Sequence, residues 1–408
     1  MNPNVRRRRF SIASAAVLLL SAGLVACSGG GKESTPPPAT PAPGAASSAP
    51  APSGDAILIG HFGSMTGSEA TFGQSTDNGI RLAIKEVNAA GGVKGRPIAL
   101  KTYDDQGKAQ EAGTAVTRLI TDDKVTAVLG EVASTLSLAG GRVAQQYGVP
   151  MITPSSTNPK VTQTGDMIFR VCFLDPFQGW VEAKFARENL KATKAAILYD
   201  QTQAYSKGLK DFFRDAFEKM GGTITTEQAF SGGDQDFSAQ LTTIRGTNPE
   251  LLFVPGYYTD VGNIAIQVRK LGIKVPMLGG DGWDSSQLAA IGGDAIEGSY
   301  FSNHYSFQED RAEVKNFVEK YKTDYGATPD GLAALGYDAA RLLFDAMGRA
   351  DSLDGKALAA AIASTKGFKG VTGSISMDAN RDARKSAVIV QMKGGMPVYV
   401  TTIEPPPL

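Results

Sequence analysis

The chain has 408 residues, of which 42% are hydrophobic, and it carries 41 basic and 41 acidic residues. This length fits two domains or lobes, and the balanced charge gives no electrostatic footprint for nucleic acid. The only cysteines are Cys27 and Cys172, and no Cys, His and carboxylate residues cluster at metal-ligand spacing. The sequence therefore predicts no structural disulfide, no metal site and no other cofactor.

The N-terminus has the pattern of an export signal. A basic run at residues 6–9 precedes a mostly apolar stretch at 11–25, which is too short for a comfortable membrane span. Leu24-Val25-Ala26-Cys27 then resembles a bacterial lipobox, so we expect cleavage after residue 26 and a lipid on Cys27 that anchors the exported protein to a membrane of the cell envelope. An ordinary signal peptide with a chance cysteine is the alternative, and the arginine run also weakly resembles a twin-arginine signal.

A tether separates this signal from the folded part. Cleavage removes four arginines, so 37 basic residues remain against 41 acidic ones, and the mature chain is slightly acidic. Residues 28–54 are dense in Pro, Ala, Gly and Ser and have almost no large apolar side chain. They bury too little surface to offset the entropy of ordering, so we expect an extended, disordered segment before a fold that spans about residues 55–403.

Strand and helix patterns alternate through the folded part. Buried-strand patterns cover residues 57–62, 97–103, 125–130, 148–153, 195–198, 251–254 and 275–278. Apolar residues at helical spacing lie at 80–87, 112–119, 209–216 and 314–321. Repeated strand–helix units form parallel sheets with helices on both faces, and the rhythm starts twice. The sequence therefore predicts an α/β protein with two doubly wound lobes.

Two hydroxyl-rich loops follow neighbouring strands of the first lobe. Residues 131–135 (Glu-Val-Ala-Ser-Thr) follow the strand at 125–130, and residues 154–159 (Pro-Ser-Ser-Thr-Asn-Pro) follow the strand at 148–153. The carboxyl ends of parallel strands are where such sheets bind small ligands. Hydroxyls and backbone N–H groups there suit a carboxylate, although these residue types are also common in ordinary turns.

The second lobe offers different chemistry at the corresponding ends. The strands at 195–198, 251–254 and 275–278 are followed by Tyr205, by Tyr257 and by an Asp281-Gly-Trp283 sequence. One lobe thus supplies hydroxyls and amides, and the other supplies a carboxylate and aromatic rings. A zwitterion between the lobes would place its carboxylate on the first lobe and its ammonium on the second.

Several segments together resemble the leucine/isoleucine/valine-binding proteins, the type I substrate-binding components of ABC transporters. The segments are residues 59–67, 88–95, 103–105, 153–159 and 280–282, and the resemblance covers about residues 55–400 in order. It implies a type I periplasmic binding protein fold, with two flavodoxin-like lobes joined by three crossings near residues 175, 304 and 385 and closing on the ligand. The implied lobes are 55–175 with 305–385 and 176–304 with 386–408.

The resemblance also implies roles for single residues. The ligand carboxylate would be held by Ser134 and Thr157, and the ammonium by the Ser155 carbonyl and by Asp281, where the leucine-binding members have a Glu. The family disulfide is absent, because its positions fall on Lys108 and Ala133. The predicted ligand-binding set is Phe72, Ser134, Ser155, Ser156, Thr157, Tyr205, Tyr257, Asp281 and Trp283.

The function expected is capture of an amino acid, branched-chain or related, and its delivery to an ABC transporter permease by a monomeric, non-enzymatic protein. The residues leave the ligand open among leucine, alanine, a polar amino acid, an amide and an aromatic or other small acid, for transport or for sensing. A secreted α/β hydrolase with Ser134 as its nucleophile is the alternative from another class. It lacks a Gly-x-Ser-x-Gly elbow, and only His61 and His304 are available as bases.

Overall fold

The structure, a computed structural model, describes residues 55–406. The predicted signal peptide, the predicted lipid attachment at Cys27 and the predicted tether lie outside these residues. Within the described part, no helix has both the length and the apolar character needed to cross a bilayer.

The first sheet has five strands in the order β2-β1-β3-β4-β5, and every neighbouring pair is parallel. Its strands are β1 (Ile57–Gly63), β2 (Ile98–Asp104), β3 (Val128–Leu129), β4 (Met151–Thr153) and β5 (Ile168–Arg170). The helices between them are α1 (Ala70–Ala89), α2 (Ala109–Thr121), α3 (Ser134–Tyr147) and the short η1 (Thr162–Thr164). The carboxyl ends of β1, β3 and β4 therefore lie on one edge of the sheet.

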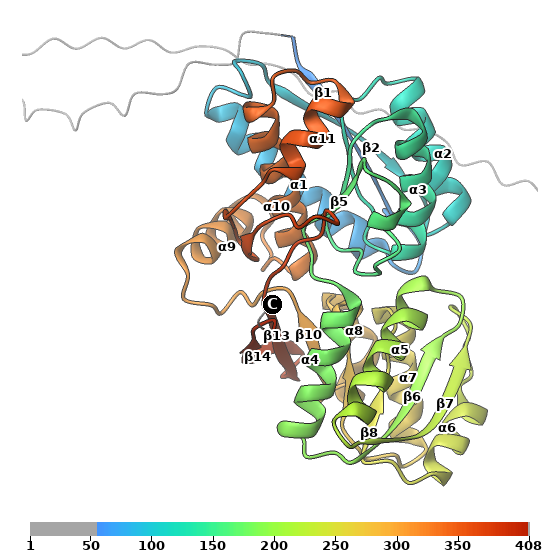
Figure 1. Cartoon of the computed structure of the whole chain (residues 1–408). Helices are drawn as coiled ribbons and strands as arrows, with labels where there is room; N and C mark the ends of the chain where they lie inside the picture. Colours follow the sequence, from blue (N-terminus) through green and yellow to red (C-terminus); the bar gives the residue numbers. More distant parts are fainter. Residues whose placement is uncertain (1–54, 407–408) are drawn as a thin grey trace, which may run out of the picture. The chain divides into compact units, whose positions relative to one another are not determined.

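The second sheet has seven strands in the order β14-β13-β10-β9-β8-β6-β7. The five strands β6 (Lys194–Asp200), β7 (Thr223–Phe230), β8 (Leu251–Phe253), β9 (Met277–Gly279) and β10 (Tyr300–Asn303) are parallel. The hairpin of β13 (Ala387–Lys393) and β14 (Met396–Ile403) extends this sheet antiparallel to β10, as the dark red strands of Figure 1 show. The helices of this half are α4 (Asp175–Glu188), α5 (Ala204–Lys219), α6 (Ser238–Gly246), α7 (Tyr258–Lys270) and α8 (Ser286–Gly292), with the short η2 (Asp281–Trp283) and η3 (Gly293–Ala295).

Segments far apart in the sequence complete the first half. After β10 the chain forms α9 (Ala312–Tyr325), α10 (Gly331–Arg349), α11 (Gly355–Ala363) and a small hairpin of β11 (Phe368–Gly370) and β12 (Gly373–Ile375). Helix α10, orange in Figure 1, packs along the blue α1. The chain thus passes between the two sheets three times: between β5 and β6, between β10 and α9, and between β12 and β13.

This architecture confirms the predicted fold class, with details that the sequence pattern missed. In α5 the predicted Leu209 and Phe213 are buried, together with Phe217, whereas Phe212 and Ala216 of the expected helix face are only partly buried. Phe213 stacks on Phe253 of β8 with ring centroids 3.9 Å apart, so this face of α5 packs on the sheet. Cys172 is fully buried, and burial raises the pKa of its thiol to about 12, so it packs as a small apolar residue.

Candidate ligand site

Residues that follow strands of both sheets meet around one small cavity. It is lined by Phe72, Val132, Ser155, Thr157, Tyr205, Tyr257, Asp281, Gly282 and Leu332. Six of these belong to the nine predicted ligand-binding residues. The cavity volume is about 10 Å³, roughly one water-sized probe, so the two halves are closed upon each other here.

Three buried hydroxyls at this cavity lack partners. The hydroxyl oxygens of Ser155, Thr157 and Tyr257 make no hydrogen bond within residues 55–406. A buried polar group without a partner costs about 1–3 kcal/mol. Three such groups facing one cavity are therefore typical of a site that a polar ligand completes.

Two other predicted serines have partners inside the protein. Ser156 Oγ is bonded to Ser137 Oγ at 2.7 Å and to the carbonyl oxygens of Glu131 and Val132 at 3.0 and 2.8 Å. Its hydroxyl thus fastens the loop after β4 to the loop after β3. Ser134, the first residue of α3, is buried and accepts a 3.3 Å hydrogen bond from the backbone N–H of Asn158. Ser134 does not line the cavity, so its contact with a ligand carboxylate stays a prediction.

Asp281 is the only acidic residue that lines the cavity, and its carboxylate is held from two sides. Gln178 Nε2 of α4 donates to Oδ1 at 2.8 Å, and His304 Nε2 lies 2.9 Å from Oδ2. Glycines flank Asp281, and a Cβ atom at Gly280 would collide with the Tyr205 hydroxyl. The close packing therefore fixes where this carboxylate points.

His304 lies where β10 leaves the second sheet, and its ring stacks on Phe173 with centroids 3.8 Å apart. Burial lowers the pKa of His304 below its ordinary value, although the hydrogen bond to Asp281 acts in the opposite direction. The imidazole is therefore neutral near pH 7 and donates its Nε2 hydrogen to the carboxylate. The second partner of Asp281 thus comes from a crossing between the two sheets.

Aromatic and aliphatic side chains form the wall of the cavity. The rings of Tyr205 and Tyr257 stack with centroids 5.4 Å apart and 6° between their planes. Phe72 meets Tyr257 edge-on at 5.4 Å. Leu332, at the start of α10, completes this wall and was missed by the sequence analysis. The sequence does contain a signal for the start of α10, because Asp330 is a typical N-cap residue directly before an apolar helix.

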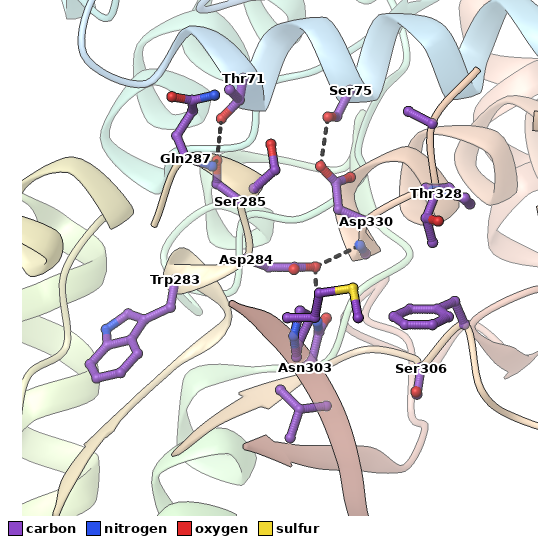
Figure 2. A pocket seen from close by; sticks show the side chains of 18 of the residues that line it. Thr71, Ser75, Trp283, Asp284, Ser285, Gln287, Asn303, Ser306, Thr328 and Asp330 are labelled. Atoms are coloured by element: carbon purple, nitrogen blue, oxygen red, sulfur yellow. Dashed lines mark hydrogen bonds between the residues drawn. The ribbon is translucent and has the colours of Figure 1, made fainter. Parts of the chain in front are cut away.

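Trp283 does not line this cavity. Its side chain is fully buried, and its indole N–H donates to the carbonyl of Val254 at 2.9 Å. Figure 2 shows the indole directed away from the polar residues of a second cavity, described below. Trp283 therefore packs in the second half and helps to place Asp281, the first residue of η2, and Asp284, which follows η2.

Buried acids surround the site, and no sequence pattern identified them. Burial, and then the neighbouring Asp105, raise the pKa of Glu131, which accepts hydrogen bonds from the backbone N–H and hydroxyl of Ser64 at 3.0 and 3.1 Å. Burial also raises the pKa of Glu182 and that of Asp175, the latter to about 8. Burial thus disfavours the ionised form of these three acids, whereas both oxygens of the Asp281 carboxylate have a hydrogen-bond partner.

Direct hydrogen bonds join the two halves around the cavity. Thr135 Oγ1 bonds to Gln203 Oε1 and accepts from the Ala204 N–H, both at 2.9 Å. Asn158 Nδ2 donates to the Ala204 carbonyl at 2.9 Å. These hydrogen bonds hold the two halves in a closed arrangement around the cavity.

Comparison with known proteins fits this geometry. A profile described as periplasmic binding protein matches residues 56–396. The chain belongs to the periplasmic binding protein family. A Leu/Ile/Val-binding protein homolog 2 from Brucella abortus (strain 2308) is 32% identical over 337 residues, which are 82% of this chain and 89% of that protein.

Solved structures of this family superpose on most of the chain. The leucine binding protein LivK from Thermotoga maritima is 41% identical, with a TM-score of 0.83, over 86% of this chain and 99% of that one. LivJ from Streptococcus pneumoniae, in complex with isoleucine, is 33% identical, with a TM-score of 0.82, over 86% of this chain and 100% of that one. A solute binding protein from Rhodopseudomonas palustris, in complex with 3,4-dihydroxy benzoic acid, is 27% identical, with a TM-score of 0.77, over 86% of this chain and 97% of that one.

Proposed function

We propose that this protein captures a branched-chain or related amino acid outside the cytoplasm and delivers it to an ABC transporter permease. The observation that carries the proposal is the composition of the small cavity. Unpaired hydroxyls of Ser155 and Thr157 come from one half, and the Asp281 carboxylate comes from the other. This pairing of donors with one negative charge suits a zwitterion.

The energetics favour a ligand that carries both charges. A buried carboxylate needs several hydrogen-bond donors, and hydroxyls supply them without adding a second charge. An ammonium beside Asp281 gains charge-assisted bonds, about twice as strong as neutral ones. Because the ligand contacts are divided between the two halves, binding favours the closed arrangement, in which all of them are made.

The wall of the cavity suits an aliphatic side chain. Phe72, Leu332 and the tyrosine rings present apolar surface, and burying each CH₂ group there contributes about 0.8 kcal/mol. The Streptococcus pneumoniae relative was solved with isoleucine, which agrees with this wall. Asp281 is one methylene shorter than the Glu of the leucine-binding members, so the ligand lies closer to η2 or is slightly larger.

An aromatic acid is the second candidate ligand, because a Rhodopseudomonas palustris relative was solved with 3,4-dihydroxy benzoic acid. Asp281 disfavours it, since a plain carboxylate ligand brings no cation to this acidic group. Hydrolysis has less support. Neither histidine bonds to Ser134 among the described residues: His61 pairs with Asp77 at 3.1 Å and His304 with Asp281 at 2.9 Å, whereas the Ser134 hydroxyl accepts from the Asn158 N–H. We therefore infer a binding protein without catalysis.

The proposal includes how the protein is exported and organised. Residues 1–26 are removed as a lipoprotein signal peptide, Cys27 carries the lipid, and residues 28–54 tether the folded part to the membrane. The lobes are residues 55–175 with 305–385 and 176–304 with 386–408, which is consistent with the strands that each sheet contains. We infer that the protein acts as a monomer in the periplasm or on the outer cell surface.

A thermal-shift screen of the purified protein against amino acids, amides and aromatic acids tests the ligand class. A ligand at 100 times its dissociation constant stabilises the folded state by about 2.7 kcal/mol. We expect leucine, isoleucine or valine to raise the unfolding midpoint. A rise with benzoate or dihydroxybenzoate alone would refute the amino-acid proposal.

A further inference from the structure

A second and much larger cavity shares no lining residue with the small one. Its volume is about 550 Å³, which is in the range of small-molecule sites. Its lining comes from α1, from the loop after β9, from the loop before α10 and from the β13–β14 hairpin. Figure 2 shows Thr71 and Ser75 of α1 hydrogen-bonded to Ser285 and Asp330, with Asp284 below them in this view.

The charge of this cavity is uncompensated. Asp284 and Asp330 line it, and among its lining residues there is no Lys, Arg or His. Burial, and then the neighbouring Asp330, raise the pKa of Asp284 to about 7. Burial also raises the pKa of Asp330. Both shifts are in the direction expected for carboxyl groups that share an enclosed space without a cation.

The two carboxyl groups differ in how fully they are bonded. Asp330 caps α10 through the Ala333 N–H at 2.9 Å and accepts from the Ser75 hydroxyl at 2.6 Å, so both of its oxygens have partners. Asp284 Oδ2 accepts from the N–H of Gly331 at 2.6 Å and from Asn303 Nδ2 at 2.8 Å. Asp284 Oδ1 makes no hydrogen bond with any described residue, although Asp284 is only 5% exposed. This oxygen is therefore an acceptor left open to the cavity that Asp284 lines.

The rest of the lining favours an organic cation over a metal ion. Among residues 55–406, no group of three or more His, Cys, Asp or Glu side chains is placed to hold a metal. Phe307, Val390, Met396 and Pro397 give the cavity an apolar side, and its volume far exceeds that of a bare ion. A protonated amine fits both features: its charge can pair with the carboxylates, and its apolar part can pack against the apolar side of the cavity.

We propose that this cavity binds a small organic ammonium, with its charged nitrogen on Asp284 Oδ1 and its apolar part against Phe307 and Met396. The site goes beyond the proposed amino-acid function, because none of its residues line the amino-acid cavity. Binding needs ionised carboxylates, so it releases protons, and the affinity rises with pH through the region in which Asp284 titrates.

Calorimetry with benzylammonium, and with benzyl alcohol as its neutral counterpart, tests the proposal on the native protein. We expect saturable 1:1 binding of benzylammonium. Its dissociation constant should be at least about tenfold lower than that of benzyl alcohol, because only benzylammonium forms an enclosed charge pair with the carboxylate. The affinity should rise about tenfold or more from about pH 5 to about pH 8. Equal binding of the two probes, or no binding of benzylammonium at either pH, would overturn the proposal.

Three variants separate this cavity from the amino-acid site. Asp284→Asn and Asp330→Asn should each weaken benzylammonium binding about tenfold, and Asn preserves the helix cap at position 330. Asp281→Asn, in the other cavity, should leave benzylammonium affinity unchanged while it weakens leucine binding. Unchanged benzylammonium affinity in both cavity variants would overturn the proposal, as would its loss in Asp281→Asn alone. Failure of leucine to bind any of these proteins would contradict only the amino-acid function.

Discussion

The loops at the carboxyl edges of the two sheets contribute opposite chemistry to the amino-acid site. The five-stranded half supplies hydroxyl donors, among them Ser155 and Thr157, which have no partner among the described residues. The seven-stranded half supplies the Asp281 carboxylate and the stacked rings of Tyr205 and Tyr257. Neither half alone can satisfy a ligand with two charges, so the ligand itself stabilises closure.

The largest effect should come from removing the charge of the seven-stranded half. Asp281→Asn keeps the shape of the side chain but leaves the ligand ammonium enclosed without a counter-ion. We expect leucine affinity to fall by about 3–5 kcal/mol, the usual cost of breaking a buried charge pair. Titration calorimetry of both proteins measures this difference, and an unchanged or improved affinity would point to an amide or a plain carboxylate as the ligand.

Removing one donor from the five-stranded half should have a smaller effect. Thr157→Val deletes a hydroxyl that has no partner within the described protein, so leucine affinity should fall by about 1–3 kcal/mol. The unfolding midpoint without ligand should change little, because the Thr157 hydroxyl lies near the Asp175 carboxyl but makes no hydrogen bond of good geometry. Calorimetry and thermal unfolding of the same sample check both statements, and a large loss of stability with normal affinity would assign Thr157 to the fold instead.

A contact between the halves should contribute less again. Thr135→Val removes the hydroxyl that bonds to Gln203 and Ala204, so the closed state and leucine affinity should lose about 0.5–1.5 kcal/mol. Thr114→Val is the matched control, since the Thr114 hydroxyl bonds only to the carbonyl of Gln110 in its own helix. Equal affinities of the two variants would show that this contact does not control closure.

The pH dependence of stability should distinguish the partner of Asp281 from the other buried groups. The pKa of His304 is lowered by burial, so the unfolded chain takes up this proton first as the pH falls. His304 therefore contributes a loss of stability that begins below the ordinary histidine pKa of about 6.5 and ends at its lowered value. His304→Gln keeps a donor for Asp281 but does not titrate. Its unfolding midpoint should fall less than that of the native protein over this range, and parallel profiles would contradict the assignment.

The sequence predicted the fold well because the fold depends on repeated local patterns. Apolar residues at strand and helix spacing identified the parallel strands of both sheets. Six predicted residues line the small cavity, and three of them lie in the segments that follow β4 and β9. The hairpin β13–β14 was not identified, because it joins its sheet only at the end of the chain. The buried helix α10 was also not identified, because it packs against segments that are distant in the sequence.

The direction of each side chain could not be predicted from the loops alone. Ser155, Ser156 and Thr157 are neighbours of similar chemistry, yet Ser156 turns into the fold to bond Ser137 while the other two face the cavity. Trp283 is two residues from Asp281 but packs in the interior, because one turn of η2 points them in different directions. The partners of Asp281 come from α4 and β10, which no local pattern connects to it.

The central claim, that this site holds both charges of one ligand, is tested most directly by titrating the native protein with leucine and with isocaproate, which is leucine without its ammonium. Leucine should bind saturably with one site per chain. Isocaproate keeps the carboxylate and the side chain but leaves Asp281 without a cation, so its affinity should be at least about 100-fold lower, a difference of roughly 2.7 kcal/mol. Binding of isocaproate as tight as that of leucine would contradict the account.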